Sequence, residues 1–183
     1  WAKRSGSTLE DQGRGVTIAT NGDVVVTGDF SSTINFGGGP LLSSAAADAF
    51  VVKYSADRTH VWSRAFGGNI GACGHDLGFA VDTDASGNVV FTGTMECPGN
   101  FGGDTLYNTT PTPDIFIAKL SPSGAHLWSR RTGSLWQLEA GRGVAIGSDG
   151  RIHVCGDFNE YANFGGGWMN SPWMSAFLVQ FDP

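Results

Sequence analysis

The chain is poor in charged residues, and above all in positive charge. Only 15% of its 183 residues are Asp, Glu, Lys or Arg, and 11 Lys and Arg against 17 Asp and Glu give a net charge of −6. A protein that binds nucleic acid neutralises phosphates with clustered Lys and Arg. The sequence contains no basic run, so we expect no nucleic-acid partner.

Long apolar runs are also missing. No stretch reaches the roughly 20 residues that a membrane-spanning helix needs, so we expect no membrane span, and no signal peptide is visible. Cysteine occurs only 3 times, whereas Gly occurs 28 times, about twice its usual frequency. Weak charge and frequent Gly-centred turns predict an all-β protein.

One pattern occurs three times along the chain. The string NFGG begins at Asn35, Asn100 and Asn163. An apolar run precedes each copy (DVVVTGDF from Asp23, NVVFTGTM from Asn88, RIHVCGDF from Arg151), and another follows it (DAFVVKYS from Asp48, DIFIAKLS from Asp114, SAFLVQFD from Ser175). Such a repeat is one supersecondary unit that cannot bury its apolar face alone, so the units are expected to stack.

Each repeat contains four predicted strands. In the middle copy these are residues 78–84, 88–95, 114–121 and 125–131, which alternate between apolar and polar or form short apolar runs between turns. Asn21-Gly22 and Asp149-Gly150 are strong hairpin signals in the other copies. The third copy lacks its fourth strand, and WAKRSG at Trp1–Gly6 matches that strand, WSRAFG from Trp62 and WSRRTG from Trp128. The expected repeats are therefore 7–67, 68–133, and 134–183 together with strand 1–6.

These motifs resemble the bacterial β-propeller repeat family, often called SBBP repeats. The resemblance is carried by the three NFGG strings, by GNVVFTG at Gly87–Gly93, and by DAFVVKY, DIFIAKL and LWSRR. It implies four-stranded blades in a bacterial secreted or surface protein and no single activity. Asp48 with Lys53, and Asp114 with Lys119, suggest a charged pair in each motif. The third copy has Ser175 and Gln180 there, so it would lack that pair.

Three blades cannot close a ring, because propellers generally need about four to eight. We therefore expect three blades per chain, with a second copy of the same chain completing a six-bladed ring. Trp1–Gly6 would form the outer strand of the blade built from Gly143–Pro183 of that copy. A β-trefoil is the alternative fold, and the residues could also be a piece of a longer chain.

The loops that differ between copies are expected on one face of the assembly, because successive antiparallel strands place their loops alternately on two faces. This face would collect aromatic residues that have no counterpart in the other repeats. Exposed aromatic clusters usually mark contacts. The candidates for binding a sugar or a peptide are Trp136, Tyr107, Trp168 and Trp173. Packing of the two last-named rings against a neighbouring blade or chain is the other interpretation.

No catalytic or metal-binding set can be assembled from the sequence. The spacing gives no Ser-His-Asp arrangement, and Asp82, Asp84 and Gly87 lack the later Glu of a calcium loop. Several carboxylates could lie near one face, but a hydrolytic pair needs a defined separation. They are Glu10, Glu96, Glu160, Asp11, Asp29 and Asp157. We expect no catalytic residue, no metal and no cofactor.

Cys73 and Cys97 are predicted to form a disulfide. If Thr83 pairs with Asn88 in the hairpin of the second copy, the two cysteines lie across its open end. The bridge would imply an oxidising compartment. Cys155 replaces the Thr27 and Thr92 of the other copies inside a strand, so it is expected to be a buried free thiol.

Together these features predict an extracellular or cell-surface module for binding, adhesion or assembly. A lectin-like protein that binds a glycan or a surface protein is the concrete version. The alternatives are a propeller-type glycosidase or polysaccharide lyase, which the fold also hosts, and a structural subunit of a larger surface assembly.

Overall fold

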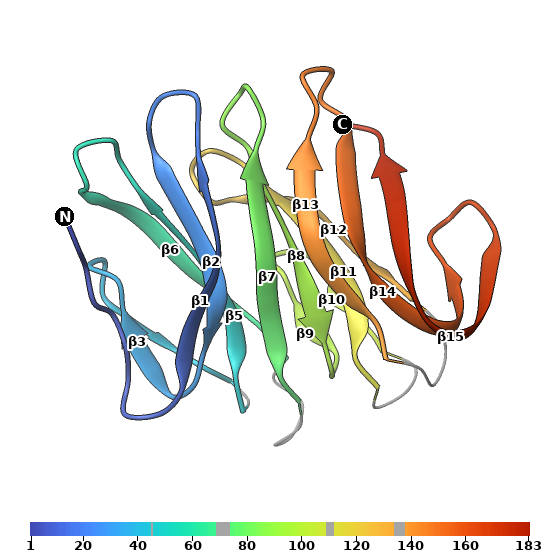
Figure 1. Ribbon diagram of the computed structural model, residues 1–183. Coiled ribbons are helices and arrows are strands. Elements are labelled where there is room, and N and C mark those ends of the chain that lie inside the picture. The colour runs from blue at the N-terminus through green and yellow to red at the C-terminus, as the bar shows by residue number, and fades with distance from the viewer. Residues whose placement is uncertain (45, 69–73, 109–111, 134–137) are drawn as a thin grey trace.

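The computed structural model describes residues 1–44, 46–68, 74–108, 112–133 and 138–183. Three antiparallel sheets stand side by side like the leaves of a fan (Figure 1). The first sheet contains β1 (Asp11–Ile18), β2 (Val24–Phe30), β5 (Asp48–Tyr54) and β6 (His60–Phe66). The second contains β7 (Asp76–Thr83), β8 (Val89–Met95), β11 (Asp114–Leu120) and β12 (His126–Thr132). The third contains β13 (Ala140–Ile146), β14 (Ile152–Asn163) and β15 (Trp168–Phe181).

The prediction of an all-β, antiparallel protein is confirmed. Every predicted strand of the three repeats is present except Trp1–Gly6, which forms no strand in the described chain. None of the sheets is closed. The strands formed because short runs of Val, Ile and Phe are separated by turns with a Gly at positive φ, such as Gly22, Gly87 and Gly150.

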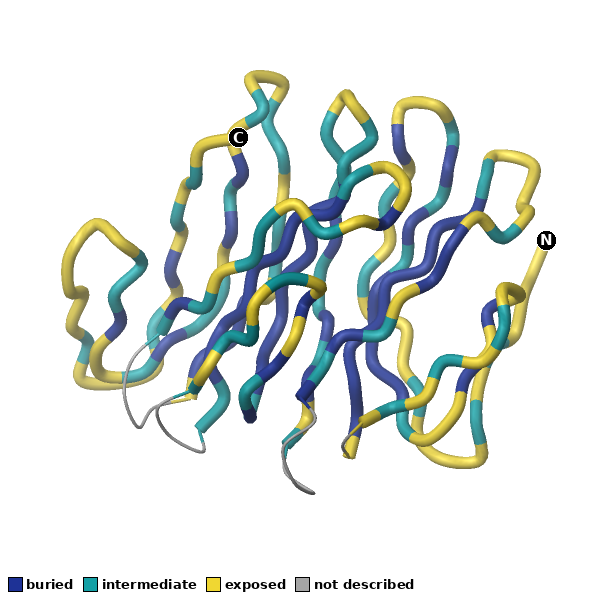
Figure 2. The backbone as a smooth tube through the Cα atoms, turned by 180° about the vertical axis from the view of Figure 1, so that it is seen from behind, coloured by how far each residue is buried: buried dark blue, intermediate teal, exposed yellow. Residues whose placement is uncertain are grey.

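The core lies between the sheets. We call the face of a sheet that is turned toward the preceding sheet its N-side face, and the opposite one its C-side face. The C-side face of the first sheet, with Val25 and Val51, packs against Phe91 and Phe116 of the second. The C-side face of the second sheet, with Val90 and Ile117, packs against the third in the same way. The second sheet is therefore covered on both faces, and β8 and β11 are buried along their whole length (Figure 2).

The third sheet has an uncovered C-side face. Ile152, Val154 and Phe177 are buried against the second sheet, so the alternate residues of β14 and β15 point the other way. Cys155 and Leu178 on that side are exposed. The prediction that Cys155 is a buried thiol is therefore wrong. Thr27 and Thr92 at the same repeat position are buried because a further sheet covers them.

The NFGG strings form the tips of hairpins that fold over the sheets. β3 (Thr33–Asn35) pairs with β4 (Pro40–Leu42), β9 (Gly99–Asn100) pairs with β10 (Thr105–Leu106), and the third string joins β14 to β15. In the first hairpin the Asn35 Oδ1 accepts a hydrogen bond from the Gly37 N–H at 2.8 Å. The Phe of each string packs on its own sheet, with ring centroids 4.6, 4.2 and 4.3 Å apart. The ring pairs are Phe36–Phe50, Phe101–Phe116 and Phe164–Phe177.

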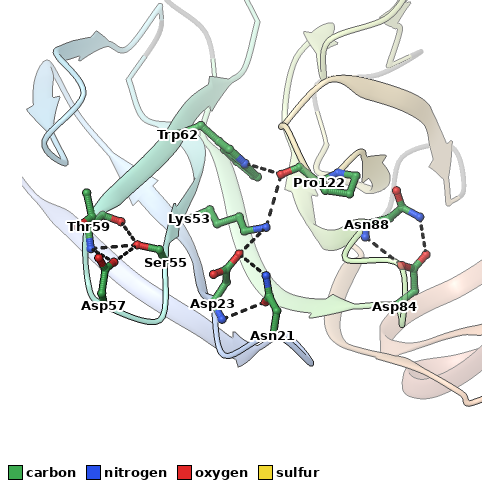
Figure 3. A network of polar contacts seen from close by, with 10 residues as sticks. All are labelled: Asn21, Asp23, Lys53, Ser55, Asp57, Thr59, Trp62, Asp84, Asn88 and Pro122. Atoms are coloured by element: carbon green, nitrogen blue, oxygen red, sulfur yellow. Dashed lines mark hydrogen bonds and ion pairs between the residues drawn. The ribbon is translucent and has the colours of Figure 1, made fainter.

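The predicted charged pairs within the DAFVVKY and DIFIAKL motifs are wrong. Residues five apart on a strand point to opposite faces. Lys53 Nζ instead reaches Asp23 Oδ2 at 2.8 Å on the neighbouring hairpin (Figure 3), and Lys119 Nζ reaches Asp84 Oδ2 at 3.3 Å. In the third repeat Arg151 replaces the position of Asp23 while Gln180 replaces the lysine. The acid and the base are thus lost together.

The predicted register of the second hairpin is also wrong by one residue. Thr83 pairs with Val89, and a bulge between Gly78 and Ala80 shifts the pairing again. The predicted register assumed strict alternation, which a bulge interrupts by adding one residue to one strand.

Candidate functional site

A β-bulge occurs at the same position in the first strand of every sheet. The register shifts between Gly13 and Gly15 in β1, between Gly78 and Ala80 in β7, and between Gly141 and Gly143 in β13. A bulge leaves one residue without a cross-strand partner and changes the direction of its side chain. The three bulged residues are Arg14, Phe79 and Arg142.

The three bulged side chains meet. β7 lies between β1 and β13 in Figure 1. The Arg14 Cζ is 5.1 Å and the Arg142 Cζ is 4.8 Å from the centroid of the Phe79 ring. Guanidinium groups at this distance are attracted by the ring. We call this set the bulge row.

An aspartate on the neighbouring strand orients each arginine. Arg14 Nε donates to Asp29, and Arg142 Nε donates to Asp157 Oδ1 at 2.7 Å. Asp29 is buried, whereas Asp157 and the two arginines are partly exposed. In the second sheet Thr94 takes the aspartate position beside Phe79. Arginine and aspartate are therefore present together or absent together.

The bulge row and its aspartates offer guanidinium donors and carboxylate acceptors at the edge of three neighbouring strands. Such groups can hydrogen-bond the hydroxyls of a polar ligand. The positive charges of the arginines are balanced by Asp29 and Asp157, so the row does not form a strongly positive site.

The sequence analysis missed this row. It placed Asp29 and Asp157 among the carboxylates near one face, but it did not identify the arginines or Phe79. A signal was present: GRGV, GFAV and GRGV occupy the same place in the three repeats. A single bulky residue inside a small-residue string at equivalent positions is a pattern that a bulge can produce.

Three of the four aromatic residues predicted to bind a ligand are among the described residues, and all three are exposed. Trp173 is 79%, Trp168 65% and Tyr107 65% exposed. Trp136 lies outside the described residues. Among the described aromatic residues, no ring contact joins Tyr107, Trp168 and Trp173. They are therefore separate exposed rings and not one stacked cluster.

The two tryptophans lie on the hairpin that joins β14 and β15. This hairpin extends past the rest of the third sheet (Figure 1), because Glu160–Asn163 pair with Trp168–Ser171 beyond an irregularity after Phe158. Trp168 borders a cavity of about 200 Å³ that Phe164 and Leu178 also line. The equivalent hairpins of the first and second repeats are shorter and carry no tryptophan.

Buried carboxylates occur where one sheet meets the next. Asp76 at the start of β7 accepts a hydrogen bond from the Gly68 N–H at 2.9 Å on Oδ2, while Oδ1 has no hydrogen-bond partner among the described residues. Burial raises the pKa of Asp76 to about 7, and the negative charge of Asp48 adds to this effect. Burial also raises the pKa of Asp114 at the next junction, against the influence of Arg131 at 2.7 Å.

These carboxylates do not form a metal site in the described part of the chain. No group of three or more His, Cys, Asp or Glu side chains is close enough to hold an ion there. Asp84, considered above for calcium, instead accepts a hydrogen bond from the Asn88 N–H at 2.9 Å in a hairpin turn (Figure 3).

Only one cysteine of the predicted disulfide, Cys97, is among the described residues. Cys73 lies outside the described residues, so its pairing with Cys97 stays a prediction. Cys97 is buried, and a Cβ added to Gly74 would lie 2.9 Å from the Cys97 Sγ. The backbone next to Cys73 therefore passes close to the Cys97 sulfur.

No family model matches the chain, and no curated protein matches it significantly. The described part of the chain contains no helix that is long and apolar enough to cross a membrane.

Proposed function

We propose that the chain is an extracellular module for binding or adhesion, and that the extended hairpin between β14 and β15 is its contact surface. The observation that carries this proposal is the exposure of Trp168, which pairs with Asn163, and of Trp173, which lies in β15 where the pairing with β14 is irregular. A flat ring on a rigid scaffold can stack on the apolar face of a sugar or on a peptide. Tyr107 and Trp136 are further candidates on the variable loops.

The proposal includes the architecture. The two four-stranded sheets and the three-stranded sheet are interpreted as consecutive blades of a β-propeller, and two copies would make a six-bladed ring. Face-to-face stacking of separate sheets supports blades over the barrel of a β-trefoil. The repeated strand order, in which each sheet is built from one repeat, supports the same interpretation.

A glycan array tests the binding function. We expect the 183-residue chain to bind a defined set of glycans, and Trp173→Ala to reduce the affinity about fivefold to a hundredfold, because stacking on an aromatic ring contributes about 1–3 kcal/mol in comparable contacts. Leu127→Ala is the matched control, since Leu127 is an exposed apolar residue on β12 away from the hairpin. Binding that survives Trp168→Ala and Trp173→Ala alike would refute this site.

The extracellular location has its own test. If Cys73 and Cys97 are bridged, alkylation of the native protein without reductant should modify one thiol, that of Cys155. Three modified thiols would argue against the bridge and against an oxidising compartment.

A further inference from the structure

We propose that a second copy of this chain covers the C-side face of the third sheet with the N-side face of its first sheet, and that its Trp1–Gly6 segment pairs with the open edge of β15. The proposal rests on the blade interpretation given above and is independent of any glycan. The chain contains two junctions of this kind, one between the first and second sheets and one between the second and third. The two uncovered faces carry the same repeat positions as the faces that meet in these junctions.

The C-side residues of the third sheet match residues that are buried in the other two sheets. Leu178 corresponds to Val51 and Ile117, which are fully buried between sheets. It is itself 72% exposed. His153 and Cys155 beside it correspond in the same way to buried residues of β2 and β8. The third sheet thus presents an apolar face whose equivalents always meet another sheet.

The N-side face of the first sheet is the matching surface. Four of its residues correspond to the residues with which the second sheet packs against the first. They are Val24, Val26, Phe36 and Phe50, at the repeat positions of Val89, Phe91, Phe101 and Phe116. A cavity of about 320 Å³ remains over these residues. The cavity is also lined by Trp1, Lys3 and Ser5. In the proposed dimer, the third sheet of the second copy packs over these residues, next to the N-terminal segment.

Glycine contacts mark the missing neighbour. A Cβ added to Gly78 would collide with the Thr27 hydroxyl of the preceding sheet, and one added to Gly141 would collide with the Thr92 hydroxyl. Gly13 is the equivalent glycine of the first sheet, and nothing lies within 4 Å of its added Cβ. In the proposed junction Cys155 of the second copy takes the place of these threonines.

The N-terminal segment already lies where a fourth strand of a preceding sheet would lie. Trp62 of β6 reaches across to the second sheet, and its Nε1 donates to the Pro122 carbonyl at 2.9 Å (Figure 3). Trp1, at the equivalent motif position, packs on the first sheet, with its ring 6.3 Å from that of Tyr54. Lys3 Nζ lies 4.4 Å from the same ring. Docking therefore needs no large movement of this segment.

The open edge fits this segment. Among the described residues β15 of the third sheet pairs only with β14, and an unpaired edge favours addition of a strand. The N-terminus and β15 lie at opposite ends of the fan (Figure 1), so the two can pair only between copies. By analogy with Ala49↔Phe66 and Lys53↔Trp62, we expect Ala176 opposite Ser5 and Gln180 opposite Trp1.

The solution mass tests the contact. At tens of micromolar protein, we expect light scattering to give twice the 19.2 kDa mass of one chain. Leu178→Glu should raise the dissociation constant of the dimer at least a hundredfold. Leu127→Glu is the matched control, because Leu127 is an exposed apolar residue on β12 of the second sheet, which contributes to neither proposed face. A wild-type chain that stays at 19.2 kDa would overturn the proposal, and so would equal dissociation by the two variants.

Cross-linking tests which surfaces meet. Ser5→Cys and Ala176→Cys, combined in a Cys155→Ser background, should form a disulfide between the two copies and give a covalent dimer under mild oxidation, because the expected register places these residues opposite each other. Either of the two new cysteines alone should not give this dimer. A dimer without this cross-link joins other surfaces and contradicts the proposal. Trp173→Ala should leave both the mass and the cross-link unchanged, so loss of glycan binding and loss of the dimer can be separated.

Discussion

The second and third sheets carry the same repeat but differ in what covers them. Ile117 in β11 and Leu178 in β15 occupy one repeat position, yet the first is 0% and the second 72% exposed. The strands form in both places, because alternation and turn chemistry are local properties of the sequence. Burial depends instead on the neighbouring sheet, and among the described residues no sheet covers the C-side face of the third.

The largest predicted difference is the cost of shortening these two side chains. Ile117→Ala should reduce the free energy of unfolding by about 2–5 kcal/mol, because it leaves a cavity between the second and third sheets. Leu178→Ala should cost less than about 0.5 kcal/mol in the monomer. Urea unfolding at submicromolar protein measures both. An equal cost at that concentration would mean that the C-side face is covered within the monomer.

The same comparison shows what the sequence could predict. The strands were predictable because DAFVVKY, DIFIAKL and SAFLVQF repeat between turn residues. For Trp168 and Trp173 the missing counterparts left exposure and packing open, and both side chains are exposed in the described part of the chain. The exposure of Cys155 was not predicted, since the prediction transferred the buried surroundings of Thr27 and Thr92 to a sheet whose C-side face is uncovered.

The bulge row could not be predicted from alternation. A bulge changes which residues face each other without changing the composition of the strand. The contacts of Arg14 and Arg142 with Phe79, moreover, depend on β7 lying between the strands of the two arginines. The partners of Lys53 and Lys119 were missed for a different reason. Asp23 and Asp84 lie next to hairpin turns and not on the strand of the lysine.

The two finished junctions also differ, and pH should separate them. The pKa of Asp76 is raised to about 7 mainly by burial, whereas Arg131 partly offsets burial at Asp114. A carboxyl whose pKa is raised in the folded state stabilises the fold most below its unfolded pKa of about 4, and this contribution is lost as the pH rises to about 7. Stability should therefore decline across this window.

Asp76→Asn tests this pH dependence. The amide stays neutral and does not repel the charge of Asp48, so we expect a gain on the order of 3 kcal/mol at pH 8 and little change at pH 4. Asp114→Asn is the comparison and should gain less stability at pH 8, because Arg131 partly offsets the effect of burial on the pKa of Asp114 and loses its charged partner in this variant. Urea midpoints at both pH values decide the matter. An equal gain at pH 4 and pH 8 would show that Asp76 does not titrate in this range.

The smallest predicted difference lies within the bulge row. Arg14→Ala should cost about 2 kcal/mol, because Asp29 is buried and would keep an unpaired charge. Arg142→Ala should cost less than about 1 kcal/mol, since Asp157 is partly exposed and water can replace the arginine. The second sheet supplies the control, because Phe79 and Thr94 show that the position tolerates a pair without charge. Combining Arg14→Phe with Asp29→Thr should therefore recover most of the stability lost in Arg14→Ala. If Arg14→Ala and Arg142→Ala have equal costs in thermal and urea unfolding, the burial of the aspartate does not determine the strength of these pairs.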